Sequence, residues 1–219
     1  MSIPNSKIFK NLSAYFISSV ITALISLLIN PFLASRLSHS DYAIIGYYSS
    51  IALLLVPIVS LSLQSYYARN YFLVDEDERQ KVYNTLLTLF STLGLIAFFL
   101  FFSLYYIYHK FCNVSIEFSP YAFLAFLPVF LSSYYNLYLM DLRMRSQGGK
   151  YAVVAVCNSV ISALLSILLV YVLNYGAIGR LWAMLITALL FATYSLLAKK
   201  ISFSFDKKII LDALSFCWP

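Results

Sequence analysis

Neutral polar side chains recur at helical spacing inside two apolar stretches of the sequence. In the first stretch they are Ser18, Thr22, Ser26 and Asn30. In the second stretch they are Asn158, Ser162 and Ser166. A spacing of four residues places side chains on one slowly rotating face of an α-helix. Each row predicts either close helix packing, with cross-helix hydrogen bonds of about 0.6 kcal/mol each, or the wall of a water-filled cavity.

Four larger side chains are better candidates for contact with a ligand. The amides of Asn30 and Gln64 are larger than the small residues that suit close helix packing, so we expect them at a cavity wall. Many of the 19 tyrosines group at the ends of apolar segments, as in the aromatic belt of a membrane protein. Tyr47 and Tyr48 lie further from such an end, and their rings are candidates for stacking on a sugar ring.

The ionisable residues do not form a catalytic or metal-binding pattern. Arg36, Arg69, Asp141 and Arg180 lie at the ends of apolar segments, and none is expected deep inside one. Buried ionisable groups usually mark proton relays and catalytic centres in membranes. The two histidines fall in predicted outer loops, and the three cysteines have no metal-ligand spacing. We therefore predict no enzyme, no metal and no cofactor, and the sequence offers no buried carboxylate for a coupling H+ or Na+ ion.

The elements that must position these residues are membrane-spanning helices. The chain has 219 residues, of which 62% are hydrophobic and 11% charged, whereas soluble domains are about 25% charged. Six long segments contain no charged residue or histidine, and a helix needs about 20 apolar residues to cross a bilayer. The predicted helices are 12–35, 43–67, 83–108, 118–140, 151–173 and 177–198. This pattern predicts an all-α integral membrane protein of six transmembrane helices.

The distribution of positive charge predicts that both ends of the chain are cytoplasmic. With the N-terminus inside, all but three of the 15 Lys and Arg residues lie in cytoplasmic segments. Residues 1–11 are then a cytoplasmic tail, and residues 199–219 begin as a cytoplasmic linker. The net charge of +6 follows from this bias and suits attraction to anionic headgroups, so it implies no nucleic-acid partner.

Three short segments resemble parts of polysaccharide export proteins. Residues 30–42 (NPFLASRLSHSDY) and 62–71 (SLQSYYARNY) resemble the ends of helices 1 and 2 in those proteins, and residues 176–180 (GAIGR) resemble the start of helix 6. The order and spacing of these three segments make the chain similar to the N-terminal part of Wzx-type O-antigen and lipopolysaccharide flippases. That family belongs to the multidrug/oligosaccharidyl-lipid/polysaccharide (MOP) exporter superfamily. Ala43 departs from the family pattern, which usually has Gly there.

The resemblance implies that the six helices form one lobe of a two-lobed, MATE-like flippase. Residues 214–219 (LSFCWP) resemble the entry to a seventh helix. We therefore expect residues 199–219 to be a cytoplasmic linker followed by the truncated start of helix 7. The missing C-terminal lobe of the same protein would supply the rest of the cavity wall.

The resemblance also implies a substrate and a role for each candidate residue. It implies transport of a polyprenyl-pyrophosphate-linked oligosaccharide, such as an O-antigen or capsule repeat unit, across the bacterial inner (plasma) membrane by alternating access. Its partners would be that lipid-linked oligosaccharide, membrane lipids and polysaccharide polymerase machinery. Arginine side chains would bind the pyrophosphate, with interface anchoring as the alternative. The candidates are Arg36, Arg69 and Arg180 for the pyrophosphate, and Asn30, Gln64, Tyr47 and Tyr48 for the sugar.

Three other functions stay open at this point. A multidrug or small-molecule exporter of the same superfamily would be favoured by intramembrane carboxylates, and the sequence predicts none. A membrane enzyme of polysaccharide assembly, such as a ligase or polymerase, usually has a large outer loop with catalytic charges, whereas the longest predicted outer loop is residues 109–117. The third alternative is a non-functional remnant.

Overall fold

A computed structural model describes residues 5–112, 116–199 and 204–217, and every regular element in these ranges is helical. The elements are α1 (Asn5–Ala34), α2 (His39–Ser60), α3 (Leu63–Asn70), α4 (Glu76–Phe111), α5 (Tyr121–Met144), α6 (Gly148–Ser166), the π-helical η1 (Ile167–Val172), α7 (Gly176–Ala198) and α8 (Lys207–Cys217). Six stretches in the described part of the chain are long and apolar enough to cross a membrane, which confirms the predicted fold class. The shortest of these stretches is α2, whose 22 residues are about 33 Å long and exceed the ~30 Å of a hydrocarbon core.

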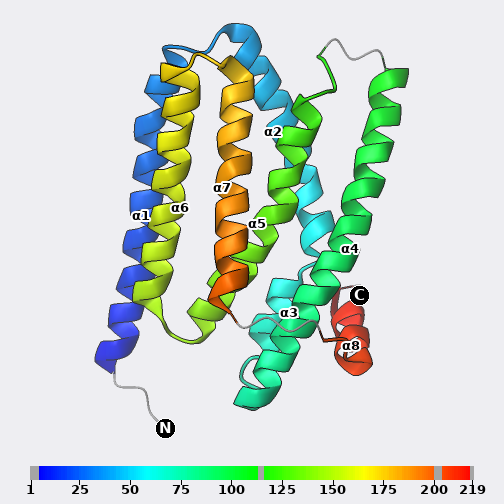
Figure 1. Ribbon diagram of the computed structural model, residues 1–219. Helices are drawn as coiled ribbons and strands as arrows, with labels where there is room; N and C mark the ends of the chain where they lie inside the picture. The colour runs from blue at the N-terminus through cyan, green and yellow to red at the C-terminus, as the bar shows by residue number, and fades with distance from the viewer. Residues whose placement is uncertain (1–4, 113–115, 200–203, 218–219) are drawn as a thin grey trace.

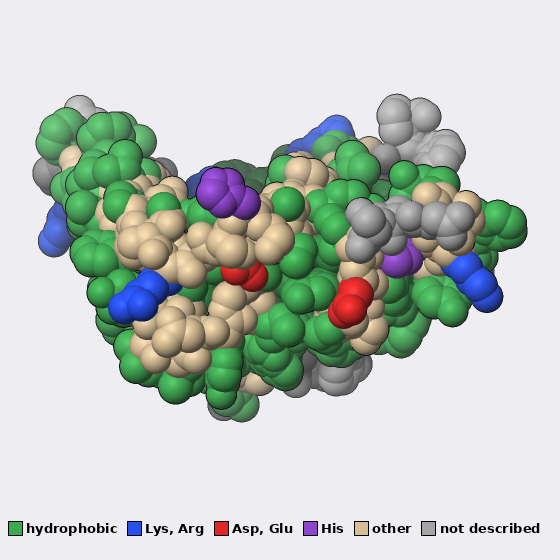
Figure 2. All heavy atoms as spheres, turned by 90° about the horizontal axis from the view of Figure 1, so that it is seen from above, with side chains coloured by type: hydrophobic (Ala, Val, Ile, Leu, Met, Phe, Trp, Pro, Cys, Tyr) green, Lys and Arg blue, Asp and Glu red, His purple; other side chains and the backbone are tan. Residues whose placement is uncertain are grey.

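The long helices stand side by side in one bundle (Figure 1). α1 packs mainly on α6, α5 packs mainly on α7, and α2 contacts α4, α5 and α7. The short helix α3 and the C-terminal ends of α5 and α7 lie at the same end of the bundle, which we call the α3 end. Seen from the opposite end, the outline is hollowed along one long side, and hydrophobic side chains cover much of the surface (Figure 2).

The predicted continuous helix over 43–67 is wrong, because the chain breaks between α2 and α3. Leu61 and Ser62 both have left-handed backbone conformations, with φ of 44° and 55°. L-residues in this conformation cannot continue a right-handed helix. The N–H of Leu61 donates to the carbonyl of Pro57 at 3.0 Å and closes the last turn of α2. The break allows α3 to pack on α5 and α4, where it presents Gln64 and Tyr67.

Other element boundaries differ from the prediction at their ends. α1 begins at Asn5, so part of the predicted tail over 1–11 is helical. α4 has 36 residues and a length of about 54 Å, so it projects beyond a bilayer core. The segment expected to begin helix 7 forms α8, which packs on α3 and α4, while residues 200–203 and 218–219 lie outside the described residues.

Two turns at the end opposite α3 are joined by the carboxylate of Asp41. Asp41 and Ser38 form a capping box at the start of α2. The same carboxylate accepts a hydrogen bond from the backbone N–H of Ala177 at 2.8 Å, in the first turn of α7. Gly176 precedes it with φ +56°, and a Cβ there would lie 2.7 Å from Asp41 Oδ1. The first and third resemblance segments therefore meet in the folded chain.

The second glycine of the third segment allows α7 to approach η1 closely. A Cβ on Gly179 would lie 2.9 Å from the carbonyl oxygen of Leu169. Real Cβ atoms do not approach so closely, so a larger residue would push α7 away from η1. The glycine thus places the next residue, Arg180, against α6.

Candidate functional site

Five of the polar residues singled out in the sequence meet in a pocket between α1, α6 and α7. They are Ser26 and Asn30 from α1, Asn158 and Ser162 from α6, and Arg180 from α7. We call this the Arg180 pocket, and its volume is about 140 Å³. Arg180 is half-buried and donates a hydrogen bond to the hydroxyl of Ser166. The guanidinium is therefore held in place at the edge of a pocket lined by hydroxyl and amide groups.

A larger central cavity of about 470 Å³ lies between α2, α5, α6 and α7. Most of its lining is apolar and includes Leu181 and Phe191. Its polar lining residues are Ser49, Ser132, Asn136, Asn158, Ser162 and Thr187. Asn158 and Ser162 also line the Arg180 pocket, so the two spaces share a wall on α6.

A third space, which we call the Gln64 pocket, continues the polar lining toward the α3 end. It measures about 320 Å³ and is lined by Ser60, Ser62, Gln64, Ser65, Ser132, Ser133 and Asn136, together with Val56 and Val129. Ser132 and Asn136 line the central cavity as well. Hydroxyl and amide groups therefore follow one another from Arg180 to Gln64, and the described linings of these three spaces include no Asp or Glu.

Asn136 and Ser132 line these spaces although neither was predicted from the sequence. Both lie within the charge-free segment that predicts α5, and Asn136 is an amide inside an apolar helix, as Asn30 and Asn158 are. That similarity was the signal by which Asn136 could have been predicted. Only the structure shows that Asn136 lines both the central cavity and the Gln64 pocket.

Three members of the predicted polar rows do not line these spaces. Ser18 is 1% exposed and donates to the carbonyl of Tyr15, while Thr22 donates to the carbonyl of Ser19. Ser166 is fully buried and contacts Arg180 instead. A step of four residues turns by about 40° beyond a full helical turn, so the row rotates away from the pocket along α1. Of the seven residues in the two rows, Ser26, Asn30, Asn158 and Ser162 therefore line the pocket, whereas Ser18, Thr22 and Ser166 do not.

The three candidate arginines do not converge on one anion. Arg36 is exposed after the end of α1, and its guanidinium lies 4.6 Å from the centre of the Tyr171 ring. Arg69 is exposed on α3, and its guanidinium lies 5.3 Å from the centre of the Phe216 ring on α8. These positions lie toward opposite ends of the bundle (Figure 1). Of the three, only Arg180 lines the connected spaces.

The expectation that Tyr48 stacks on a sugar ring is wrong for this conformation. Its side chain is fully buried, and its hydroxyl donates to the carbonyl of Glu117 at 2.6 Å. The ring packs against Tyr121 and Phe126 in the hydrophobic core. Tyr47 is half-buried and its hydroxyl accepts a hydrogen bond from Tyr105 at 3.1 Å, so it also belongs to this aromatic cluster.

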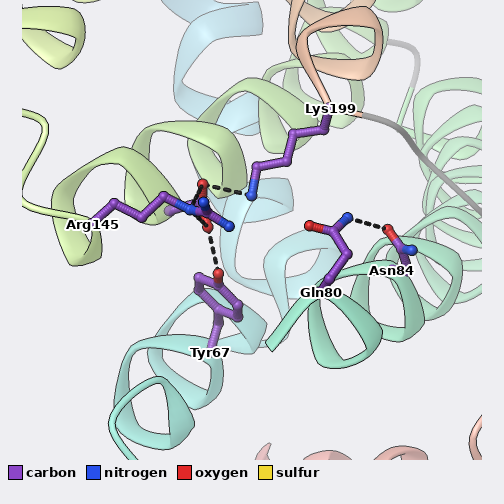
Figure 3. Close-up of polar contacts among 6 residues, drawn as sticks. Tyr67, Gln80, Asn84, Arg145 and Lys199 are labelled. Carbon is purple, nitrogen blue, oxygen red and sulfur yellow. Dashed lines mark hydrogen bonds and ion pairs between the residues drawn. The ribbon is translucent and has the colours of Figure 1, made fainter. Parts of the chain in front are cut away.

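The expectation that no carboxylate is buried is wrong as well. Asp141, near the end of α5, is 0% exposed. The hydroxyl of Tyr67 donates to Asp141 Oδ1 at 2.5 Å, and Arg145 Nε and Lys199 Nζ lie 3.0 Å and 2.6 Å from Oδ2. Figure 3 shows these side chains converging from different elements, beside a separate hydrogen bond between Gln80 and Asn84. We call Asp141, Tyr67, Arg145 and Lys199 the Asp141 cluster.

Burial and neighbouring charges shift the pKa values of two groups in the Asp141 cluster. Burial, and then the neighbouring carboxylate, raise the pKa of the Tyr67 hydroxyl, so this group remains a donor. Burial lowers the pKa of the Lys199 ammonium, and the contact with Asp141 opposes that effect. Asp141 therefore helps to keep a largely buried lysine charged.

The described residues offer no group of three or more His, Cys, Asp or Glu side chains that could hold a metal ion. Cys112 and Cys157 are free and exposed. Within the part of the chain that is described, the chemistry on offer in the three connected spaces is hydrogen bonding by neutral groups, with one guanidinium at one end.

The fold and the connected polar spaces define a polytopic membrane protein with a partly polar interior. Residues 8–219 match the polysaccharide biosynthesis protein family, and the chain belongs to that family. No curated protein matches the chain closely enough to name as a relative.

Solved structures of MOP superfamily transporters share the fold. A MOP superfamily transporter from Pyrococcus furiosus matches with a TM-score of 0.72 and 16% identity over 95% of this chain and 51% of that one. A MATE crystallised in complex with MaD3S matches with a TM-score of 0.70 and 19% identity over 99% and 52%. An outward-facing multidrug resistance MATE family transporter matches with a TM-score of 0.68 and 16% identity over 97% and 51%. The chain spans about half the length of these structures.

Proposed function

We propose that this chain forms one half of a flippase that moves a polyprenyl-pyrophosphate-linked oligosaccharide, such as an O-antigen or capsule repeat unit, across the bacterial inner membrane. The observation that carries the proposal is the run of neutral hydrogen-bonding groups from the Arg180 pocket to the Gln64 pocket, inside otherwise apolar helices. Membership of the polysaccharide biosynthesis protein family supports the substrate class. The shared fold supports alternating access, with a second half of the transporter closing the cavity.

The chemistry of the lining suits a sugar head group. Burying a hydroxyl without a hydrogen-bond partner costs roughly 2–7 kcal/mol, so an oligosaccharide cannot cross hydrocarbon unaided. The amides of Asn136 and Asn158 each offer two donors and one acceptor, and the serine hydroxyls offer both roles. Such groups replace the water around sugar hydroxyls without placing a charge beside them. The polyprenyl tail would stay in the surrounding lipid.

Arg180 is the residue best placed to bind the pyrophosphate. It is the guanidinium of the connected spaces, and its contact with Ser166 orients it. A guanidinium presents a fixed set of donors that matches phosphate oxygens. Arg36 and Arg69, which are exposed and stacked on aromatic rings, would instead contact lipid headgroups at the two membrane surfaces.

A multidrug exporter is the second candidate, because most of the lining of the central cavity is apolar. One of the solved structures that share the fold is a multidrug resistance transporter. An apolar cavity of this kind can hold a flat hydrophobic cation as readily as one face of a sugar. The two candidates differ in what the Arg180 pocket does, since a cationic drug gains nothing from a guanidinium.

The test measures transport by the full-length protein in proteoliposomes. The substrate is a fluorescent polyprenyl-pyrophosphate oligosaccharide. A membrane-impermeant quencher then shows what fraction of it lies in the outer leaflet of the vesicle. Loss of a charge-assisted hydrogen bond worth about 1.5–3 kcal/mol should slow flipping by about 10- to 100-fold in Arg180→Gln. Lys150→Gln, which removes an exposed charge at the start of α6, is the matched control and should flip at the wild-type rate.

Two results would contradict the proposal. One is an equal flipping rate in Arg180→Gln and Lys150→Gln. The other is a wild-type protein that does not flip the lipid-linked oligosaccharide but exports a fluorescent organic cation, which would favour the second candidate. Arg36→Gln and Arg69→Gln are informative alongside, since a loss comparable to that of Arg180→Gln would restore the prediction that all three arginines bind substrate.

A further inference from the structure

Several hydroxyls in the three connected spaces already donate their protons to the backbone. Ser132 and Thr187, in the central cavity, donate to carbonyls of the preceding helical turn at 2.9 Å and 2.7 Å. Ser133 in the Gln64 pocket and Ser26 in the Arg180 pocket do so at 3.1 Å each. A hydroxyl has one proton and two lone pairs, so these four groups present acceptor oxygens to a ligand.

The amide side chains of the lining supply donors, and each brings an acceptor with it. Asn136 and Asn158 line the central cavity, and Gln64 lines the pocket beside it. Each amide has an NH2 group with two donors and one carbonyl oxygen. Together with the four hydroxyls, these groups suit a ligand that both donates and accepts. Sugar hydroxyls and the acetamido group of an N-acetyl sugar do both, whereas an ionised carboxylate only accepts.

The charges of the lining lead to the same expectation as its hydrogen-bonding groups. The residues described as lining the three spaces include no lysine or histidine, and the guanidinium among them belongs to Arg180, at one end. In the proposed function that guanidinium is occupied by the pyrophosphate. Apolar side chains such as Leu53, Val56 and Phe191 make up most of the central cavity wall. Placing an ionised carboxylate beside such a wall without a partner costs far more than placing a hydroxyl there.

We infer that the central cavity selects uncharged sugar units, such as hexoses, deoxyhexoses and N-acetylhexosamines, and discriminates against uronic acids and other acidic sugars. The inference rests on the proposed function, because it names the class of oligosaccharide that the same site takes. Asn136 on α5 and Asn158 on α6 both line the cavity, so a sugar unit there meets amides from two helices. A carboxylate on that unit would instead face the acceptor oxygens of Ser132 and Thr187.

The test measures binding of two matched probes to the full-length protein in detergent micelles, by microscale thermophoresis. Both probes are polyprenyl-pyrophosphate trisaccharides that differ in one unit. One has a hexose in the middle, and the other has the corresponding hexuronic acid, in which a carboxylate replaces the CH2OH group. The contact of the pyrophosphate with Arg180 is common to both and cancels in the comparison. We expect the neutral probe to bind about tenfold more tightly, because the carboxylate loses water without gaining donors.

A charge added to the cavity wall should reduce this preference. Asn136→Lys places an ammonium in the lining and should bring the two affinities within about twofold of each other. Asn158→Lys makes the same change from α6, so the test does not depend on the folding of one variant. Gly149→Lys is the matched control, because it adds the same charge at an exposed position with open space around it, and should keep the wild-type preference.

Three results would overturn the inference. The first is equal binding of the two probes by the wild-type protein, and the second is binding of neither. The third is an unchanged preference in both Asn136→Lys and Asn158→Lys, which would place the discrimination outside the central cavity. Binding is measured without transport, so a protein that prefers the neutral probe but does not flip it in proteoliposomes would refute the proposed function and leave this selectivity standing.

Discussion

Asp141→Asn should destabilise the protein far more than removal of an equally short ion pair at its surface. The substitution removes the negative charge but keeps an amide oxygen that can accept from Tyr67. Lys199, 10% exposed, is then left without a counter-charge. Breaking a buried pair in this way costs about 3–5 kcal/mol. For a domain of this size each kcal/mol lowers the melting temperature by about 2–4 °C, so we expect a fall of roughly 6–20 °C.

The chain contains a matched control. Asp206 and Lys81 form a pair at 2.7 Å, against 2.6 Å for Asp141 and Lys199, but the Lys81 side chain is 57% exposed. Exposed pairs are screened by water and contribute little. Asp206→Asn should therefore leave the melting temperature unchanged within error, as measured by circular dichroism in detergent micelles.

The double variant Asp141→Asn, Lys199→Met provides the sharpest check on this reasoning. It removes both charges of the buried pair, so no uncompensated ammonium remains, and the guanidinium of Arg145 is 30% exposed to water. It should recover much of the stability that Asp141→Asn loses, because neutral replacement of a buried pair is often tolerated. An equal fall in melting temperature for Asp141→Asn and Asp206→Asn, or no recovery of the melting temperature in the double variant, would show that burial is not what makes Asp141 important.

Two further predictions concern helix contacts. Gly179→Ala places a Cβ 2.9 Å from the carbonyl oxygen of Leu169 and should cost about 1–3 kcal/mol of stability by overpacking, whereas Gly149→Ala, with open space around it, should be neutral or slightly stabilising in the same unfolding assay. Contact with Lys81 lowers the pKa of Asp206 from its ordinary 3.8. Asp206 therefore adds a small, local stabilisation to the docking of α8 above that pH, too small to move the melting temperature, and loses it as the pH falls through the lowered value. Hydrogen-exchange protection of α8, corrected for intrinsic rates, should fall as the pH falls through that value. In Asp206→Asn the protection of α8 should be the same above and below it.

The membrane-spanning helices could be predicted because their signal is local. Each apolar segment must satisfy its backbone hydrogen bonds internally to lie in lipid, so length and composition are enough to identify it. The break at Leu61 and Ser62 could not be predicted in this way, since two left-handed residues leave no mark on hydropathy. Its consequence is large, because it turns α3 and its Gln64 toward the cavity.

The kind of chemical groups in the candidate site could be predicted from the sequence, but not which residues line it. Amides and hydroxyls inside apolar helices are expensive unless they have partners, so Asn30, Asn158 and Ser162 stood out from the sequence. Ser18 carries the same signal, yet it points into a helix contact. Tyr48 looked available for stacking and is fully buried. The direction of a side chain depends on which helix lies beside it, and periodicity alone does not provide that information.

The amino-acid sequence by itself determined that this is an all-α membrane protein and that neutral polar groups, with arginines at the helix ends, are its available chemistry. The tertiary structure alone decided that Arg180 joins those groups while Arg36 and Arg69 do not. It also decided that Asp141, at the end of a predicted helix, is buried by Tyr67 and Lys199, which lie 74 and 58 residues away in the chain. Burial and charge pairing are properties of neighbours in space, whereas hydropathy is a property of neighbours in sequence.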